Sequence, residues 1–366
     1  MFVFPSMRRA LGAALNVGLV LAALGTVALA QDKVTTKDQK IKDVKIVSEN
    51  FDNLIVSLEG GTSGMRWKDI DSIKYSNADK YYKAVNAFTA GSVSDSIPQL
   101  EELNADTKLR PVLKHNVLYY LGMAYLKTGA ADKSLAMHQE LLKTFPKSRY
   151  LLQVGANVAN ISVARKDAAG AQRTLDAAAT AAAAPKESAI QAAFDLLKGR
   201  LLEEQEKFTE AESTYDRILS NPKAEGDLQP SAKLGKARCA HRANRAIDAE
   251  RQFRDLLSAD APNYVLAGAA NGLGDLWLAQ GTANRDADMI KDALLAYLRG
   301  KVMYIPERDS STEEYERALA GAALANTALS QLEPNADRKK LYQSRAKQLK
   351  DELTRDYPQS RYLAAK

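Results

Sequence analysis

Four basic side chains follow one another at helical spacing in the second half of the chain. They are Arg238, His241, Arg242 and Arg245. The spacing of i, i+3, i+4 and i+7 places them on one face if this stretch is a helix. Such a face can hold carboxylates through charge-assisted hydrogen bonds, so we expect it to bind an acidic segment of a partner protein. The alternative is a solvated outer face.

Two adjacent tyrosines offer a second candidate contact. Of Tyr119 and Tyr120, one is expected in the core, while the other could present its ring to a partner. We take Tyr119 as the candidate binding residue.

The remaining reactive side chains indicate neither catalysis nor metal binding. His115 and His138 are expected to be packing or surface residues, and the single cysteine, Cys239, to be a buried small residue. The acidic run of residues 203–212 is interpreted as a solvated face. The sequence contains no phosphate-binding loop, no zinc-binding motif and no nucleophile motif. We therefore expect no enzymatic activity and no cofactor.

The composition is that of a folded globular protein. Of the 366 residues 46% are hydrophobic and 26% charged, which is enough apolar material for a core. The net charge is +6, and Arg8 and Arg9 contribute two of these charges. The +4 left for residues 31–366 is too small an excess to indicate nucleic acid as a partner.

Residues 1–30 have the pattern of a signal peptide. Arg8 and Arg9 precede an uncharged apolar stretch that ends in Ala28-Leu29-Ala30, before the polar Gln31. This order predicts cleavage between Ala30 and Gln31 and a periplasmic or secreted protein. An uncleaved membrane anchor is the alternative, because residues 10–30 are just long enough to span a bilayer. We expect the mature chain to be soluble, with peripheral association with the outer membrane or cell wall left open.

Residues 31–76 predict a small β domain of four or five short strands separated by turn residues. The pattern resembles the small SH3-like barrels of some bacterial envelope proteins, with Gln39 where the first turn usually has glycine. Eight basic and eight acidic side chains balance in this segment, which argues against binding to phosphates.

From residue 77 onward the apolar spacing is that of amphipathic helices, and it repeats. Six glycines recur at gaps of about one helical hairpin, where a small residue lets two helices approach closely. They are Gly122, Gly155, Gly199, Gly235, Gly274 and Gly321. A second marker, aromatic-Pro-x-Ser-Arg-Tyr, occurs at 145–150 and again at 357–362. The spacing predicts seven hairpins, at about 77–104, 111–144, 148–182, 187–220, 229–258, 263–300 and 311–356.

These features resemble the tetratricopeptide repeat (TPR), a helix-turn-helix unit of about 34 residues. Leu118, Leu121-Gly122, Tyr125 and Pro146 follow the pattern of the family, although Ser134 and His138 replace its usual Ala and Phe. Lys207 to Ala211, with Tyr215 and Ile218, match the turn and second helix of the repeat. The junctions look most like those of outer-membrane assembly and Tol-Pal-associated envelope proteins.

The resemblance implies a mainly α protein whose residues 77–366 form a right-handed superhelix. It also implies a function: a periplasmic scaffold that binds another envelope protein in its concave groove. The alternative is an accessory subunit that binds cell-wall glycan or positions an envelope enzyme. Exposed aromatic residues in the groove would favour glycan, whereas charged and Asn-rich walls would favour protein.

Overall fold

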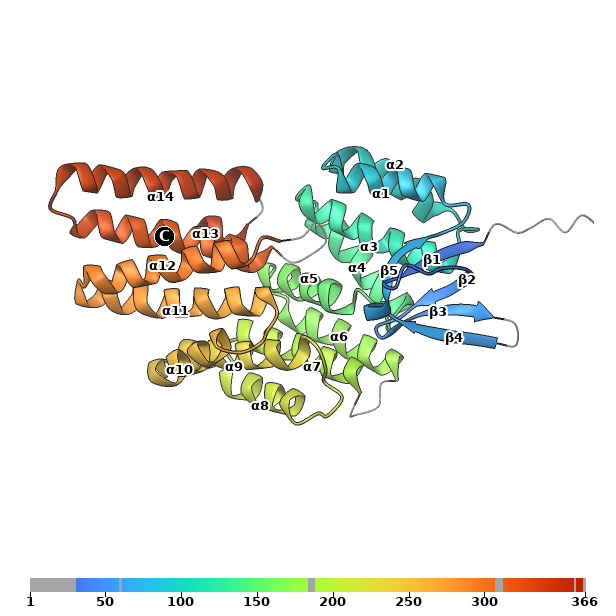
Figure 1. The fold of residues 1–366 in the computed structure, drawn as a ribbon, viewed down its shortest axis with the longest axis horizontal. Coiled ribbons are helices and arrows are strands. Elements are labelled where there is room, and N and C mark those ends of the chain that lie inside the picture. Colours follow the sequence, from blue (N-terminus) through green and yellow to red (C-terminus); the bar gives the residue numbers. More distant parts are fainter. Residues whose placement is uncertain (1–30, 59–60, 184–187, 307–311, 359, 365–366) are drawn as a thin grey trace, which may run out of the picture.

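A computed structural model describes residues 31–58, 61–183, 188–306, 312–358 and 360–364. The predicted signal peptide lies outside the described residues. In Figure 1 a small sheet lies beside the first helices, and the remaining helices follow it as a curved array of antiparallel pairs.

The described residues 31–76 form one antiparallel sheet, as the strand pattern predicted. Its strands are β1 (Asp32–Thr36), β2 (Ile41–Glu49), β3 (Asn53–Leu58), β4 (Gly61–Arg66) and β5 (Ile70–Lys74). The strand order is β4-β3-β2-β1-β5, so β4 and β5 are the two edges and the sheet stays open. The barrel expected from the sequence is therefore not closed. The buried residues of the sheet, such as Val34 and Leu54, instead share one hydrophobic cluster with the first helices.

The turn between β1 and β2 explains how Gln39 can replace glycine. Gln39 has a φ of 60°, in the left-handed region that glycine adopts most easily. Its backbone N–H donates to the carbonyl oxygen of Thr36 at 2.8 Å, which closes the turn.

Within the described residues, fourteen α-helices follow the sheet. They are α1 (Asp79–Thr89), α2 (Val93–Ala105), α3 (Pro111–Lys127), α4 (Ala131–Thr144), α5 (Leu151–Ala164), α6 (Ala168–Ala182), α7 (Ala189–Glu204), α8 (Phe208–Leu219), α9 (Leu228–Arg242), α10 (Ala246–Leu257), α11 (Asn263–Asn284), α12 (Ala287–Met303), α13 (Glu313–Leu332) and α14 (Ala336–Asp356). Each odd-numbered helix pairs with the next, and the paired helices begin and end within a few residues of the predicted hairpins. The fold is thus a mainly α solenoid.

The turns inside six of these pairs share one feature of backbone conformation. Each contains a residue with positive φ, which reverses the chain at the end of the first helix. These residues are Gly91, Gly129, Lys166, Glu206, Asn244 and Arg285. Four of them carry side chains, so glycine in the sequence marks only part of the turns.

Five of the six recurring glycines form slots for large side chains of even-numbered helices, whereas Gly155 lies against Leu197 of α7. Tyr215 of α8 lies against Gly199 of α7 and Gly235 of α9, where any Cβ atom would collide with its ring. Tyr297 of α12 lies in the same way between Gly274 of α11 and Gly321 of α13. One aromatic ring therefore joins two successive pairs, which explains the glycine spacing.

We expect Gly199→Leu to destabilise the protein by about 1–3 kcal/mol, because overpacking forces the ring of Tyr215 and two helices apart. Urea unfolding followed by circular dichroism measures the change. Ser213→Leu, at an exposed position of α8, is the matched control and should stay within about 0.5 kcal/mol of wild type. Equal stabilities of the two variants would show that the slot is not close-packed.

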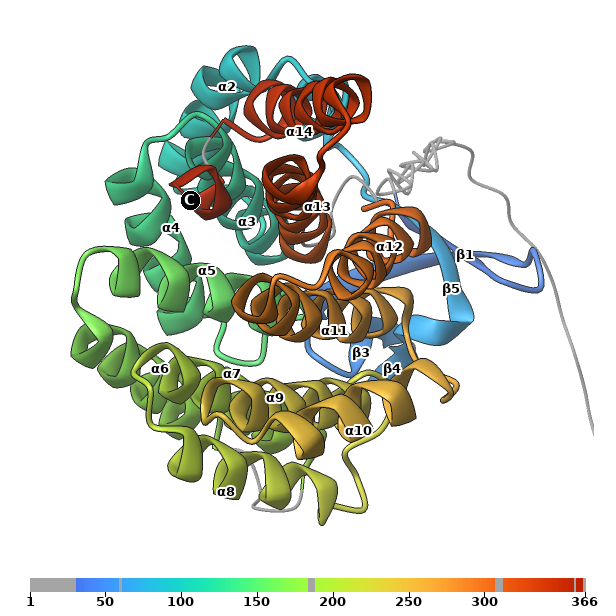
Figure 2. The same ribbon diagram turned by 90° about the vertical axis from the view of Figure 1, so that its left-hand side faces the viewer.

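Along its axis the array curls until late helices lie close to early ones. Figure 2 shows the curved path of the helices, and Figure 1 shows that α11 to α14 are displaced along the long axis from α3 to α6. We call the side on which α7, α9, α11 and α13 face one another the inner face. None of the helices in the described ranges is both long and apolar enough to cross a membrane.

Candidate functional site

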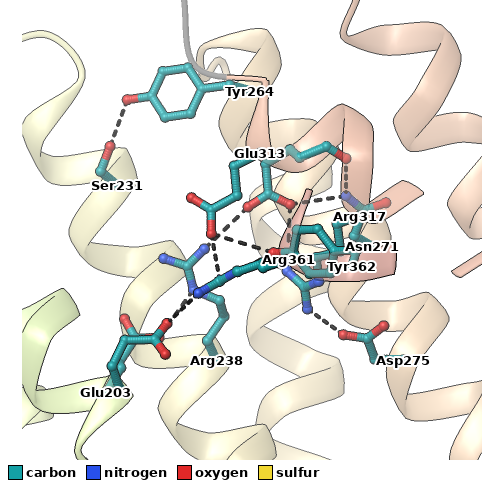
Figure 3. Close-up of polar contacts among 12 residues, drawn as sticks. Glu203, Ser231, Arg238, Tyr264, Asn271, Asp275, Glu313, Arg317, Arg361 and Tyr362 are labelled. Carbon is teal, nitrogen blue, oxygen red and sulfur yellow. Dashed lines mark hydrogen bonds and ion pairs between the residues drawn. The ribbon is translucent and has the colours of Figure 1, made fainter. Parts of the chain in front are cut away.

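A network of buried ion pairs lies on the inner face, and Arg238 of α9 is its centre. The Nε atom of Arg238 is 3.2 Å from Oε2 of Glu203 in α7, and its Nη1 is 3.2 Å from Oε1 of Glu314 in α13 (Figure 3). The side chain of Arg238 is 18% exposed, and those of the two glutamates are 7% and 8% exposed. This cation therefore links three helices away from bulk water.

The network continues from α13 to α11. Asn271 Nδ2 donates to the backbone oxygen of Glu314 at 2.8 Å and to its Oε2 at 2.9 Å. Arg317 Nη1 lies 3.5 Å from the same carboxylate, and Arg317 also pairs with Asp275. Because the charges alternate along this chain of contacts, each ion has an opposite charge beside it.

The two slot tyrosines end the network at both sides. Tyr215 donates its hydroxyl hydrogen to Glu203, and Tyr297 Oη donates to Asp275 Oδ1 at 2.6 Å. The glycine slots let these rings pass between helices, so their hydroxyl groups reach the inner face. The same two tyrosines thus pack the helices together and take part in the polar network.

The electrostatics of the network hold its two guanidinium groups in their charged forms. Burial opposes ionisation of Arg238, but the carboxylates of Glu203 and Glu314 outweigh it, so the pKa of Arg238 is raised above its usual value. Burial likewise opposes ionisation of Arg317, but Asp275 and Glu314 outweigh it and raise its pKa. Neither guanidinium can act as a general base.

A cavity of about 190 Å³ opens beside the network. Its walls are Ala156, Ala159 and Asn160 of α5, Leu197, Arg200, Glu203 and Glu204 of α7, Arg238 and Arg242 of α9, Glu313 and Arg317 of α13, and Arg361 and Tyr362. Residues from four helices and from the last described segment therefore meet at one place.

Arg361 belongs to the second aromatic-Pro-x-Ser-Arg-Tyr motif and lies in a short 3-10 helix, Arg361–Ala364. Its Nη1 is 3.0 Å from Oε1 of Glu204, which is 157 positions earlier in the chain, and its Nη2 is 2.7 Å from Oε1 of Glu313. Tyr362 Oη donates to the same oxygen of Glu313 at 3.4 Å. The cavity is thus lined in part by a segment of this chain whose arginine bridges two carboxylates.

The predicted basic face is divided among different environments. Arg242 Nη1 donates to the backbone oxygen of Glu203 at 2.8 Å, and Arg245 pairs with Glu212 of α8. Helix α9 ends at Arg242, so Arg245 precedes α10 and does not continue the face. Burial lowers the pKa of His241, so its neutral form is favoured.

These positions correct the expectation of one basic face made of four side chains. Arg238 and Arg242 do line the cavity, but the charge of Arg238 is already balanced within the chain. Contact of the four residues with a partner stays a prediction. A face whose arginines have carboxylate partners of their own gives no support for the expected acidic ligand.

Tyr119 lies in the core, which corrects its expected presentation to a partner. It is 2% exposed, and its ring stacks on Tyr150 with centroids 3.8 Å apart. Tyr120 is buried as well, at 8% exposure. Both tyrosines therefore serve the packing around α3.

A second buried ion cluster joins the sheet to the helices. Arg149 Nε is 3.0 Å from Oε2 of Glu49 in β2, and Asn116 Nδ2 donates to that oxygen at 3.1 Å. His115 Nδ1 is 3.5 Å from the same oxygen, and Tyr75 donates its hydroxyl hydrogen to Glu49. The acidic side chain of the sheet is thus enclosed by groups from α3 and the α4–α5 junction.

The remaining candidates are packing residues, with one correction. His138 is fully buried against Gly122, and burial lowers its pKa to about 4. Cys239 is buried, as expected. Glu203 is 5% exposed, so the interpretation of residues 203–212 as a solvated face is wrong for this residue. Within the described ranges no three His, Cys, Asp or Glu side chains gather as metal ligands would.

A larger hollow of about 450 Å³ lies between α10, α11 and α12, away from the ion network. Trp277, Met289 and Leu295 provide apolar walls, and Arg254 and Arg299 are at its border. Leu295 is 63% exposed. This hollow is a second possible binding surface, so experiments on the inner face can use it for comparison.

Comparison with known proteins finds similarity only to solved structures. No family model matches the chain, and no curated protein matches its sequence. A tetratricopeptide repeat protein from Parabacteroides merdae ATCC 43184 is 16% identical with a TM-score of 0.44, covering 74% of this chain and 98% of that one. PilW, a widely conserved type IV pilus biogenesis factor, is 18% identical with a TM-score of 0.40, covering 68% and 96%. PilF of Pseudomonas aeruginosa is 17% identical with a TM-score of 0.36, covering 68% and 94%.

Proposed function

We propose that this protein is a non-catalytic scaffold that binds a segment of a partner protein in the cavity of the inner face. The observation that carries the proposal is that Arg361 bridges Glu204 and Glu313. A short polypeptide segment, although of this chain itself, thus already lies in the cavity. Stacked helical pairs offer an extended surface of the kind used to dock peptides.

The composition of the cavity supports a protein ligand over a glycan. Eight of its thirteen lining residues are charged, and Tyr362 is its one aromatic residue. Sugar rings are usually held on exposed aromatic faces, whereas peptide segments use charge pairs and hydrogen bonds. The alternative of a glycan-binding accessory subunit therefore has less support.

The proposal has two further parts, export and the absence of catalysis. The order of charges and apolar residues in 1–30 supports export and cleavage between Ala30 and Gln31, hence a periplasmic or secreted scaffold. Intact-mass measurement of the protein from its host distinguishes a chain that begins at Gln31 from one that retains the leader. The absence of catalysis is supported by the mutual pairing of the buried charges, which leaves Glu203 and Arg238 engaged with each other.

Filling the cavity is the direct test of partner binding. Asn160 is an exposed residue on the cavity wall, so we expect Asn160→Trp to reduce recovery of the partner from a host extract at least tenfold. Wild type and Ser213→Trp, a bulky change at an exposed site of α8, serve as controls in quantitative mass spectrometry. If no captured protein depends on position 160, binding in the cavity is wrong.

A further inference from the structure

The described residues of the two aromatic-Pro-x-Ser-Arg-Tyr motifs make the same local contacts. In each, the serine Oγ accepts from the backbone N–H of the tyrosine two residues later, at 3.0 Å for Ser148 and 3.2 Å for Ser360. In each, the guanidinium lies over the ring of the following tyrosine, at 4.5 Å for Arg149 and 5.2 Å for Arg361.

In each motif the arginine also lies within ion-pair distance of a carboxylate. Arg149 reaches Glu49 at 3.0 Å, and Arg361 reaches Glu313 at 2.7 Å. The chain thus uses one short sequence twice as a carboxylate-binding unit. The ring of the tyrosine lies against the guanidinium, and the arginine supplies a positive charge to the acid.

The two copies differ in how firmly they are held. The first leads directly into α5, whose Leu151 is fully buried. The second leads into the 3-10 helix Arg361–Ala364, which has no buried residue. The Arg361 side chain is 48% exposed, against 27% for Arg149. Because this segment has no buried residue and its arginine is half-exposed, the second copy can leave its site without unfolding the array.

Departure of that copy would uncover a site with defined chemistry. Glu204 and Glu313 supply two carboxylates, and Leu197 and Ala156 supply apolar walls. Burial opposes ionisation of Glu313, but Arg361 and other nearby arginines outweigh it and lower its pKa, so its carboxylate is charged at neutral pH. A guanidinium next to an aromatic ring complements this site.

We propose that residues 360–364 are an internal occupant of the inner-face cavity, and that a partner segment carrying arginine followed by an aromatic residue displaces them and makes the same contacts. This inference rests on the proposed function and names the chemistry of the partner. An internal competitor weakens the apparent affinity by the fraction of molecules in which the site is open, so the partner must match or exceed its contacts.

The test uses the full chain and a fluorescein-labelled peptide with the sequence of residues 357–364. We expect Arg361→Ala to bind this peptide at least tenfold more tightly than wild type in fluorescence anisotropy, because the internal arginine no longer competes. Arg355→Ala, which removes a 72% exposed arginine of α14, is the matched control and should bind like wild type.

The carboxylates are tested in the Arg361→Ala background. Adding Glu204→Gln and Glu313→Gln should weaken peptide binding at least tenfold, and a peptide with alanine in place of its arginine should bind as weakly. If the double change impairs folding by circular dichroism, Glu204→Gln alone, at a 28% exposed side chain, should still weaken binding about threefold.

Two outcomes overturn the inference. Equal peptide binding by wild type and Arg361→Ala would show that residues 360–364 do not compete for the site. Absence of peptide binding to every variant, or binding that ignores both glutamates, would show that the cavity does not accept an Arg-Tyr segment. Neither outcome changes the result expected for Asn160→Trp, so the proposed function can fail or stand separately.

Discussion

Replacing Arg238 with methionine should lower the free energy of unfolding by about 3–5 kcal/mol. The change keeps the apolar stem but leaves the carboxylates of Glu203 and Glu314 without the cation that lies 3.2 Å from each. Breaking one side of a buried ion pair costs this much because the remaining charge stays desolvated. Urea unfolding at neutral pH measures the loss.

Two companion variants separate this cause from loss of packing. Arg251→Met removes a 69% exposed arginine of α10 and should cost less than about 0.5 kcal/mol. Adding Glu203→Gln and Glu314→Gln to Arg238→Met should restore part of the stability, because no unpaired charge then remains. A loss in Arg238→Met no larger than that of Arg251→Met would contradict the buried network.

Glu49→Leu should destabilise the contact between sheet and helices by a similar amount, about 3–5 kcal/mol. The substitution leaves Arg149 without its carboxylate and removes the acceptor of Asn116 and Tyr75. Asp43→Leu is the control, since Asp43 lies on the same strand with a side chain that is 57% exposed.

The dependence of stability on pH tests the same contact independently. Burial opposes ionisation of Glu49, but the contact with His115 and the charge of Arg149 outweigh it, so the folded-state pKa lies below 4.5. A lowered pKa contributes stability that is present above pH 4.5 and is lost as the pH falls through the folded-state value. Wild type should therefore lose stability below about pH 4.5 more steeply than Glu49→Leu. Parallel curves for the two proteins would contradict a charged, paired Glu49.

The helical pairs could be predicted from sequence because their signals are local. The glycine spacing reflects a contact between neighbouring helices, as the position of Tyr215 between Gly199 and Gly235 shows. Apolar periodicity within each helix likewise depends only on which side of that helix is covered. Such patterns identify the helices and their pairing without knowledge of the final curvature.

The ion network could not be predicted in this way. Arg238 meets Glu314, 76 positions later, only because α9 and α13 both pack against α11 and their side chains meet on the inner face. Periodicity indicates that Arg238 and Arg242 share a face, but not that the face is opposite carboxylates. The sequence predicts a solvated Glu203 because periodicity does not indicate which other helices cover a face. The repeated Ser-Arg-Tyr was the one local signal of the site, because an identical triplet in two distant places implies an identical contact.

The open sheet was missed for a related reason. The strand pattern of residues 31–76 is the same whether β4 and β5 pair with each other or not. Closure depends on what covers the buried face, and here the shared cluster around Val34 and Leu113 includes the first helices. A sheet covered by helices needs no partner strand to complete its core.

Photo-crosslinking from two positions tests the central claim that the inner face is the binding surface. A photoreactive phenylalanine derivative at position 242 lines the inner-face cavity, whereas the same group at position 295 lines the hollow between α10, α11 and α12. In host cells, we expect position 242 to yield a covalent adduct with a partner protein that Asn160→Trp abolishes, and position 295 to yield none. Adducts from position 295 alone, unaffected by Asn160→Trp, would place the binding surface at the hollow between α10, α11 and α12 and contradict the account.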